Sequence, residues 1–298
     1  MKKRAVSVML TAAMVSAMLA GCGSKNAETQ SAADTTAESA ASGDETSADT
    51  QAADAETTDA ETTDASKTDG TFTVGFDQDF PPMGFVGDDG EFTGFDLEMA
   101  AEVAKRLNLM IAYQPIAWDA KDMELDAGTI DCIWNGFTIN GREDDYEWSK
   151  PYMKHHQVFV VRGASDINSE ADLAGKNVEV QTDSSAEAAL NDNSELTSTF
   201  GSLTPVADYN TAFMDLESGA VDAIAMDDVV ASYQITSRKA DFKVLDDVIA
   251  AEEYGIGFKK GNTGLRDKVQ ATLEEMAADG TAAKISEKWF GKDITTIQ

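Results

Sequence analysis

Cysteine, proline and positive charge are scarce in this sequence of 298 residues. Two cysteines cannot build a disulfide framework. Five prolines beside 22 glycines exclude a collagen-like or proline-rich chain. The 23 Lys and Arg residues stand against 54 Asp and Glu residues, which makes the formal net charge −31. Because such a polyanion repels phosphate backbones, we expect no nucleic acid among its partners.

Long hydrophobic runs are missing from residues 70–298, so no membrane span of ~18 residues is expected there. The N-terminus differs: Lys2-Lys3-Arg4 precedes an apolar stretch that ends in Leu19-Ala20-Gly21-Cys22. This order is typical of an export signal, here residues 1–21. The last four residues resemble the lipobox of bacterial lipoproteins, which implies cleavage before Cys22 and a diacylglycerol anchor on its sulfur. The alternative is a plain secretory peptide with a chance cysteine.

Residues 22–69 follow as a segment that contains no Val, Ile, Leu, Met or aromatic residue. From residue 23 to 69 there are 28 Ala, Ser or Thr residues and 12 acids, and Asp-Ala-Glu-Thr-Thr occurs twice in tandem, at 54–58 and 59–63. Such a composition cannot repay the entropy of ordering. We therefore expect an acidic tether that acts as a spacer. The tether accounts for −10 of the net charge. About a third of the net charge therefore lies outside the part of the chain that is expected to bind a ligand.

Motifs for catalysis and for metal binding are also absent. The sequence has no Gly-x-Ser-x-Gly, no phosphate-binding Gly-rich loop and no His-Glu-x-x-His. The two histidines, His155 and His156, are adjacent, so their side chains diverge on a strand. Asp131 and Asp222 could form a carboxylate pair, but capping or solvent exposure is the simpler interpretation. We expect no enzyme activity, no cofactor and no metal, and Cys132 as a buried, inert thiol.

Strands and helices alternate from residue 70 to the end, which indicates an α/β fold with parallel strands. Asp96 stands where an N-cap belongs, and apolar residues at helical spacing follow it until Asn108. The predicted strands cover 72–76, a segment before Trp118, 130–134, 178–181, 221–226 and 255–258. The predicted helices cover 97–107, 186–191, 211–218, 228–236 and two segments ended by Gly280 and Gly291.

Ligands of open α/β sheets bind beyond the carboxyl ends of the strands. The first three strand ends present Asp77 and Phe80, then Trp118, then Asn135-Gly136-Phe137-Thr138, with Arg142 one turn later. Aromatic faces, a hydroxyl and an Arg that can grip a carboxylate suit a small zwitterion. Taken singly, the aromatic residues could be core and Arg142 could pair with a neighbouring acid on the surface.

The second half supplies a complement to these groups. Ser184 and Glu187 have the spacing of a capping box, so a helix should begin at Ser184-Ser185 with N–H groups that attract an anion. The strand at 221–226 runs into Asp227 and Asp228, whose carboxylates could hold an ammonium group. Asp228 could instead cap the next helix.

Several blocks in order resemble the family-3 extracellular solute-binding proteins, the polar amino-acid-binding proteins of ATP-driven importers. The resemblance runs from about residue 72 to 291 and rests on Val74-Gly75-Phe76-Asp77 with Pro82, Gly94-Phe95-Asp96-Leu97, 131–138, Trp148-Ser149-Lys150-Pro151-Tyr152, Leu173-Ala174-Gly175-Lys176, 222–227 and 280–291. It implies a type II periplasmic-binding-protein-like fold, in which two lobes close on the ligand around two hinge strands. The hinges should lie near Val158–Val161 and Glu252–Ile256, with lobe 1 at 70–160 and 255–298 and lobe 2 at 161–254.

The resemblance also implies roles for the strand-end residues. Arg142, Thr138 and the Ser184-Ser185 helix end would take an α-carboxylate, and Asp227 would take an α-ammonium. Phe80 and Trp118 would flank the ligand side chain, with Asp77, Asn135 and Gly136 completing the wall. One departure stands out: the turn from Thr138 to Arg142 is one residue shorter than the family pattern, and the Glu follows the Arg. A deletion that Gly141 absorbs accounts for this.

The sequence thus predicts a monomeric lipoprotein, anchored to the outer face of the cytoplasmic membrane, that passes a polar L-amino acid to ABC permease subunits. The alternatives are an enzyme on the same scaffold, either dehydratase-like or part of a wall-cleaving enzyme, and a sensor domain. A sensor would need a membrane span or a further domain after Gln298. The side-chain preference stays open between cationic amino acids and Gln or cystine.

Overall fold

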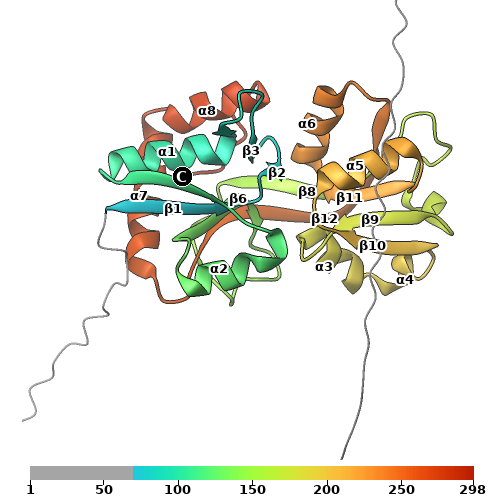
Figure 1. Ribbon diagram of the computed structural model, residues 1–298, viewed down its shortest axis with the longest axis horizontal. Helices are drawn as coiled ribbons and strands as arrows, with labels where there is room; N and C mark the ends of the chain where they lie inside the picture. The colour runs from blue at the N-terminus through green and yellow to red at the C-terminus, as the bar shows by residue number, and fades with distance from the viewer. Residues whose placement is uncertain (1–69) are drawn as a thin grey trace, which may run out of the picture. The chain divides into compact units, whose positions relative to one another are not determined.

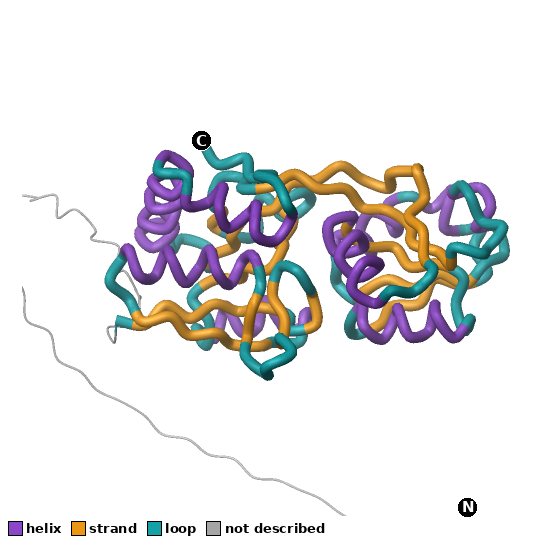
Figure 2. The backbone as a smooth tube through the Cα atoms, turned by 90° about the horizontal axis from the view of Figure 1, so that it is seen from above, coloured by secondary structure: helices purple, strands orange, loops and turns teal. Residues whose placement is uncertain are grey.

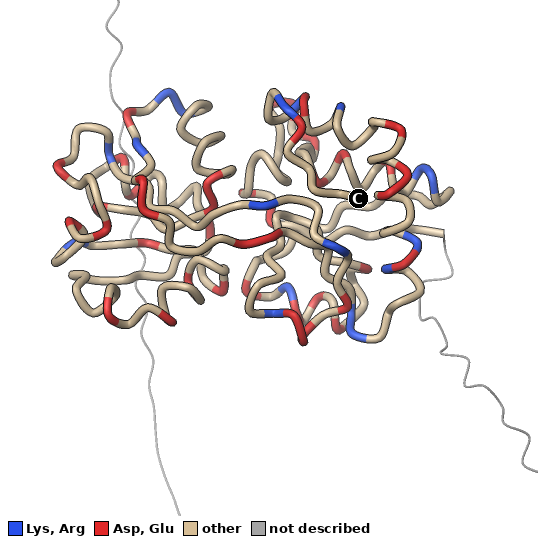
Figure 3. The backbone as a smooth tube through the Cα atoms, turned by 180° about the vertical axis from the view of Figure 1, so that it is seen from behind, with Lys and Arg blue, Asp and Glu red and all other residues tan. Residues whose placement is uncertain are grey.

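A computed structural model of the chain describes residues 70–298, which form two α/β lobes joined by two long strands (Figures 1 and 2). The predicted signal peptide at 1–21, the lipidated Cys22 and the tether at 22–69 lie outside the described residues. Within residues 70–298, no helix has both the length and the apolar character that crossing a membrane requires. Figure 3 shows that acidic residues are spread over both lobes.

The secondary-structure bounds are as follows. The strands are β1 (Thr71–Phe76), β2 (Asp79–Phe80), β3 (Gly84–Val86), β4 (Phe92–Thr93), β5 (Met110–Pro115), β6 (Cys132–Thr138), β7 (Glu147–Trp148), β8 (Met153–Arg162), β9 (Asn177–Gln181), β10 (Ser202–Val206), β11 (Ala223–Asp227) and β12 (Phe242–Phe258). The α-helices are α1 (Phe95–Arg106), α2 (Lys121–Ala127), α3 (Ser185–Asp192), α4 (Ser194–Thr197), α5 (Tyr209–Ser218), α6 (Asp228–Arg238), α7 (Thr263–Ala278) and α8 (Thr281–Phe290). Two 3-10 turns are η1 (Trp118–Ala120) and η2 (Glu170–Leu173).

One continuous sheet runs through both lobes in the order β10-β9-β11-β8-β12-β6-β1-β5, with β7 paired to β12. We call the lobe that contains β1, β5 and β6 lobe 1, and the lobe that contains β9, β10 and β11 lobe 2. In lobe 1, β1 lies between β5 and β6 and is parallel to both; in lobe 2, β9 is parallel to β10 and β11. Parallel strands end at the same edge, so their carboxyl ends converge in each lobe.

The two joining strands are β8 and β12, which pair antiparallel with each other. β12 also pairs with β6 of lobe 1, and β8 pairs with β11 of lobe 2. The predicted strand at 255–258 was too short, because β12 begins at Phe242. Register shifts between Val244 and Val248 and between Val248 and Ala250 interrupt its alternation, which is why no strand period is visible there.

Helices cover both faces of each lobe's sheet, so the central strands are buried on both sides. In lobe 1, α1 and α8 lie over one face and α2 over the other (Figure 1). The alternation along β6 divides its side chains between two apolar clusters: Cys132 and Trp134 pack with the α1 side, and Ile133 and Phe137 with the α2 side. Cys132 is fully buried and free, and burial raises the pKa of its thiol, which fits the predicted inert role.

Two predicted local structures were wrong. Asp96 is not an N-cap: Gly94 holds that position, and the Asp96 carboxylate is buried in the first turn of α1. The third strand does not end at residue 134 but continues to Thr138, so Asn135–Thr138 belong to β6. Polar Asn135 and Gly136 resemble a loop in sequence, and Gly136 is left-handed (φ 57°), yet β12 pairs antiparallel with Phe137 and Thr138 beyond them.

Of two predicted caps, Ser184 is confirmed and Asp228 is not. Ser184 does cap α3, because its Oγ accepts from Glu187 N at 3.1 Å, but the Glu187 carboxylate accepts from Asp183 N instead of completing the capping box. Asp228 is the first residue of α6 and does not cap it. Its carboxylate pairs with His156, with Oδ2 3.1 Å from Nδ1.

Candidate functional site

A small cavity lies where the strand ends of the two lobes meet. It brings together all ten residues predicted for the site and adds one more, Gln181. The lining residues are Asp77, Phe80, Trp118, Asn135, Gly136, Thr138, Arg142, Gln181, Ser184, Ser185 and Asp227.

The lobe 1 wall begins with a hydrogen-bonded pair of polar residues. Asp77 follows the last residue of β1, and its backbone N–H donates to Asn135 Oδ1 at 3.1 Å. The Asp77 carboxylate accepts from Asp79 N at 2.8 Å and from Gln181 Nε2 at 2.7 Å. Burial raises the pKa of Asp77 to about 6, and these two hydrogen bonds oppose the shift. The carboxyl group therefore changes charge close to neutral pH.

Aromatic rings form the apolar part of the wall. Phe80 packs against Tyr209 of lobe 2 with ring centroids 5.9 Å apart, and Trp118 stands edge-on to Phe137 at 5.5 Å. Gly136 allows Phe80 to lie this close, because a Cβ at residue 136 would come within 2.8 Å of the Phe80 ring. Its left-handed backbone also disfavours any other residue. The cavity thus has one flat, apolar region beside its polar groups.

The lobe 2 wall consists of the N-terminus of α3 and the end of β11. Ser185 is buried, and its Oγ lies 3.0 Å from Thr138 Oγ1 of lobe 1. Asp227 is only 4% exposed. Its Oδ1 accepts from Tyr254 OH at 2.7 Å and from Gln157 Nε2 at 2.9 Å. Among the described residues no hydrogen bond is made to Oδ2, so that oxygen is free to accept from a ligand.

Arg142 occupies the tight turn after β6. Its N–H donates to Ile139 O at 2.9 Å across the turn, and Gly141 takes a left-handed conformation (φ 78°). The guanidinium donates to Thr138 O at 3.4 Å and to Asp183 O of lobe 2 at 3.1 Å, and it lies over the Phe137 ring. It forms no ion pair with Glu143 or Asp144 within residues 70–298. The shorter turn therefore still delivers a cation to the cavity.

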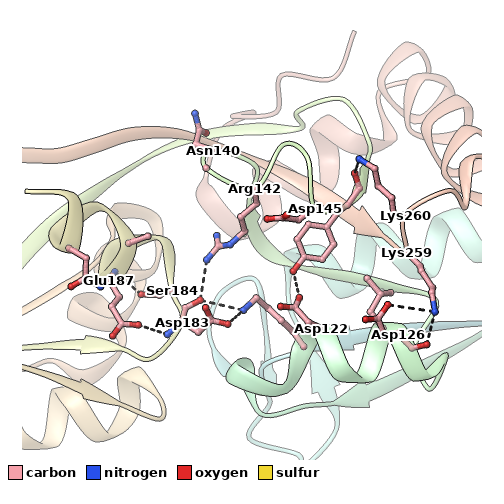
Figure 4. A pocket seen from close by; sticks show the side chains of 16 residues that line it. Asp122, Asp126, Asn140, Arg142, Asp145, Asp183, Ser184, Glu187, Lys259 and Lys260 are labelled. Atoms are coloured by element: carbon pink, nitrogen blue, oxygen red, sulfur yellow. Dashed lines mark hydrogen bonds and ion pairs between the residues drawn. The ribbon is translucent and has the colours of Figure 1, made fainter.

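A second, outer pocket of about 580 Å³ lies beyond Arg142, between α2 and the start of α3 (Figure 4). Lys121 of lobe 1 is 1% exposed and pairs there with the carboxylate of Asp183 in lobe 2. Its ammonium also lies 5.3 Å from the centre of the Trp118 ring. Figure 4 shows Arg142 and Asp183 facing each other across this mouth. The pair links the two lobes, and removing one partner would leave the other without its counter-charge.

Polar contacts between the lobes are concentrated around the inner cavity. Besides the pairs of Asp77 with Gln181 and of Thr138 with Ser185, Asn210 Nδ2 donates to Asp79 Oδ1 at 2.7 Å. Each contact joins a lobe 1 strand end to a residue of lobe 2. A ligand in the cavity would touch both lobes at once.

Gln181 was not predicted as a site residue. It is the last residue of a predicted strand, however, and so lies at the carboxyl end of a strand, as Asp77 does. A layer behind Asp227 was not predicted either; it is formed by His155, Gln157, Glu252 and Tyr254. These residues come from β8 and β12, whose pairing joins segments about a hundred residues apart. No local pattern marks such a contact. Within residues 70–298, no group of His, Cys, Asp or Glu is placed to hold a metal ion.

Comparison with known proteins places these features in a family. The model of the bacterial extracellular solute-binding proteins, family 3, matches residues 72–292. The L-cystine-binding protein TcyJ of Escherichia coli (strain K12) is 34% identical over 228 residues, 76% of this chain and 84% of that protein.

Two solved structures are similar in fold as well as in sequence. An ABC uptake transporter substrate-binding protein from Streptococcus pneumoniae with bound histidine has a TM-score of 0.74 and 34% identity, covering 76% of this chain and 95% of that one. An ancestral arginine-binding protein bound to glutamine has a TM-score of 0.69 and 36% identity, covering 75% of this chain and 99% of the other.

Proposed function

The chain belongs to the bacterial extracellular solute-binding proteins, family 3, and we propose that it captures a polar L-amino acid for an ABC importer. The single observation that carries this proposal is the cavity, which presents a cation, carboxyl groups and two aromatic faces in one space between the lobes. The chain is similar to an L-cystine-binding protein and to a substrate-binding protein with bound histidine. This similarity supports a polar amino acid as the ligand. We propose that the chain is a binding protein and not an enzyme, so a bound amino acid should be recovered from it unchanged.

The ligand backbone is held at two opposed charges. Arg142, Thr138 and the N–H groups at the start of α3 take the α-carboxylate, since a guanidinium and a helix N-terminus both favour an anion. Asp227 takes the α-ammonium through its unused Oδ2. Phe80 and Trp118 flank the side chain. Together these groups recognise the zwitterion common to all amino acids.

The remaining polar groups select the side chain. Asp77, Asn135 and Gln181 line the cavity, and Arg142 is the one Lys or Arg residue among its lining residues. With Arg142 engaged by the α-carboxylate, an acidic side chain would meet Asp77 without a counter-charge. We therefore propose ligands with a cationic or neutral polar side chain and rejection of aspartate and glutamate.

Binding proceeds by closure of the lobes around β8 and β12. We assign residues 70–160 and 255–298 to lobe 1 and residues 161–254 to lobe 2. A ligand that bridges both lobes binds the closed state more tightly than the open one and shifts the population toward it. The inter-lobe contacts around the cavity support this mode.

The proposal is tested by thermal unfolding with L-cystine, L-histidine, L-arginine, L-glutamine and L-glutamate. At a hundredfold excess over its dissociation constant, a ligand stabilises the protein by about 2.7 kcal/mol, which raises the midpoint by roughly 5–10 °C. At least one of the first four should do so, and L-glutamate should not. No shift with any of the four would contradict the proposed function.

Replacing Lys121 with methionine should weaken the closed state, because the buried pair with Asp183 joins the two lobes. We expect the bound amino acid to dissociate about two to five times faster, since Asp183 is half exposed and the pair is partly solvated. Stopped-flow fluorescence of the tryptophans would measure this rate. Lys105→Met is the control, because Lys105 pairs with Glu102 inside one helix and should leave the rate unchanged. Equal rates for both variants would mean that the pair does not contribute to closure.

We further propose that the mature protein is a monomer tethered outside the cytoplasm through a lipid on Cys22 and that it docks on permease subunits in the membrane. The lipobox-like Leu19-Ala20-Gly21-Cys22 supports the anchor. Mass spectrometry of the processed protein would test whether Cys22 is the modified N-terminal residue.

A further inference from the structure

A buried layer of titratable residues lies directly behind the ammonium subsite, where β8 and β12 cross between the lobes. His155 of β8 stands opposite Glu252 of β12 in the strand register. Tyr254 follows on β12, and Asp227 lies at the end of β11. His155 is 1% exposed and Glu252 8% exposed. The layer therefore has little access to water.

The His155 ring is held between two carboxylates. Its Nδ1 lies 3.0 Å from Asp227 Oδ1, although the N–H direction is not aligned for a hydrogen bond. Its Nε2 lies 3.6 Å from Glu252 Oε2 and 3.2 Å from Thr138 Oγ1. The ring stacks on Tyr254 with centroids 3.8 Å apart and an angle of 18°. These contacts fix the imidazole in one orientation.

Gln157 ties the two carboxylates together. Its Nε2 donates to Asp227 Oδ1 at 2.9 Å, to Glu252 Oε2 at 3.1 Å and to Ser185 Oγ at 3.0 Å. Glu252 Oε2 also accepts from Thr138 Oγ1 at 3.4 Å. Within residues 70–298, neither Asp227 nor Glu252 pairs with a Lys or an Arg. Among the described residues, His155 is the side chain beside them that can take a positive charge.

Charge balance then defines how many protons the layer holds. Buried charges persist only when they are paired. The ammonium of a bound amino acid balances one carboxylate, that of Asp227, and leaves Glu252 without a partner. One additional proton, on the imidazole or on the carboxyl group, makes the liganded site neutral. Because the two groups are in contact, that proton belongs to the pair.

We propose that His155 and Glu252 share one proton in the closed, liganded protein. This proton balances the charge of Glu252, so the negative charge of Asp227 pairs with the ligand ammonium. The inference rests on the proposed function, and His155 is in this sense a positioning residue. The groups that face the pair are Asp227 of β11, Tyr254 of β12, Gln157 of β8, Thr138 of β6 and Ser185 of α3, with Tyr209 of α5 near Asp227. His156 and Asp228 lie on the other side of β8 and pair with each other.

Ligand affinity should consequently depend on pH in one direction. In the open protein water reaches the layer, so Glu252 can stay charged without the proton. Closure removes that water, so the closed protein holds the proton. Binding therefore takes up a proton at any pH at which the open protein has not already bound one. Affinity therefore falls as pH rises, at most tenfold per pH unit for one proton.

The test is isothermal titration calorimetry of the full chain from pH 6 to 8.5 in buffers with different ionisation enthalpies. The probes are L-arginine, L-glutamine and L-cystine, because the L-histidine side chain titrates in this range. The wild type should take up protons, and its affinity should fall with pH. Glu252→Gln keeps the shape but needs no proton, so its affinity should fall less steeply with pH than that of the wild type, while the contribution of Asp77 is common to both proteins. His156→Gln, the control on the same strand, should behave as the wild type.

A second pair of variants separates this role from a structural one. His155→Gln should bind on the order of 30-fold or more weakly at pH 8, because Glu252 is left charged and buried. Combining it with Glu252→Gln should restore affinity to within about threefold of Glu252→Gln alone, which loss of packing would not do. A pH dependence in Glu252→Gln as steep as that of the wild type, or a double variant as weak as His155→Gln, would overturn this inference but not the proposed function. A wild type that binds none of these probes and shows no thermal shift with L-histidine would overturn the proposed function as well.

Discussion

Asparagine in place of Asp227 is expected to weaken amino-acid binding by roughly 30- to 5,000-fold, the range for an unpaired buried charge. The carboxylate is 4% exposed, and its Oδ1 is already held by Tyr254 and Gln157. Asparagine can keep these two hydrogen bonds but cannot neutralise an ammonium. Calorimetry with the best ligand from the thermal panel would measure the loss.

Asp228→Asn is the matched control for Asp227, because the two residues are adjacent and carry the same group. The Asp228 carboxylate contacts His156 and does not line the cavity. Its replacement should change affinity by less than about twofold, as is usual for a partly exposed pair. Wild-type affinity in Asp227→Asn, or an equal loss in both variants, would contradict the assignment of Asp227 to the ammonium.

The location of the site could be predicted from the sequence because the rule behind it is topological. Once a segment is recognised as a parallel strand, its carboxyl end must lie at the ligand edge, so Asp77, Trp118 and Asp227 could be gathered without any distance information. The predicted family and two-lobed fold are confirmed by the family match and by the solved relatives. The role of each residue toward a ligand stays a prediction.

What the sequence could not predict depends on contacts between distant segments. Glu252 and His155 meet because β8 and β12 pair over most of their length, and the bulges in β12 remove the alternation that would have marked it. Asp96 has the residue type and position of an N-cap, so only the packing of α1 on β6 shows its actual place. Gly136 resembles a turn residue, but it serves to bring Phe80 close to β6.

The Asp96 carboxyl group is expected to make the free energy of unfolding depend strongly on pH. This group is fully buried, with Oδ2 accepting from Gly136 N at 2.6 Å and from Tyr152 OH at 2.9 Å, while Oδ1 has no partner within residues 70–298. Burial raises the pKa of Asp96 from 3.8 to about 7, and the two hydrogen bonds oppose the shift. Gly136 lines the cavity, so its hydrogen bond to Asp96 connects α1 to the wall of the site.

Asp96→Asn should therefore change the pH dependence of the free energy of unfolding. A group whose folded pKa is raised stabilises the protein fully below its unfolded pKa and loses that contribution as pH rises through its folded pKa, here about 7. Between pH 5 and 8 the wild type should lose about 2–3 kcal/mol through Asp96, and the variant should not. Asp77 and Glu179, whose pKa values are raised to about 6 and about 7, act in the same direction in both proteins, so only the difference between the two proteins is informative.

Urea unfolding of the wild type and Asp96→Asn at pH 5 and pH 8 measures this difference. The variant should gain stability relative to the wild type as pH rises. Asp88→Asn, which replaces an exposed carboxylate of the same lobe, should follow the wild type at both pH values. Parallel curves for the wild type and Asp96→Asn would mean that the Asp96 carboxyl group does not titrate near neutral pH. In that case hydrogen bonds from Gly136 and Tyr152 would outweigh burial and keep the group ionised throughout this range.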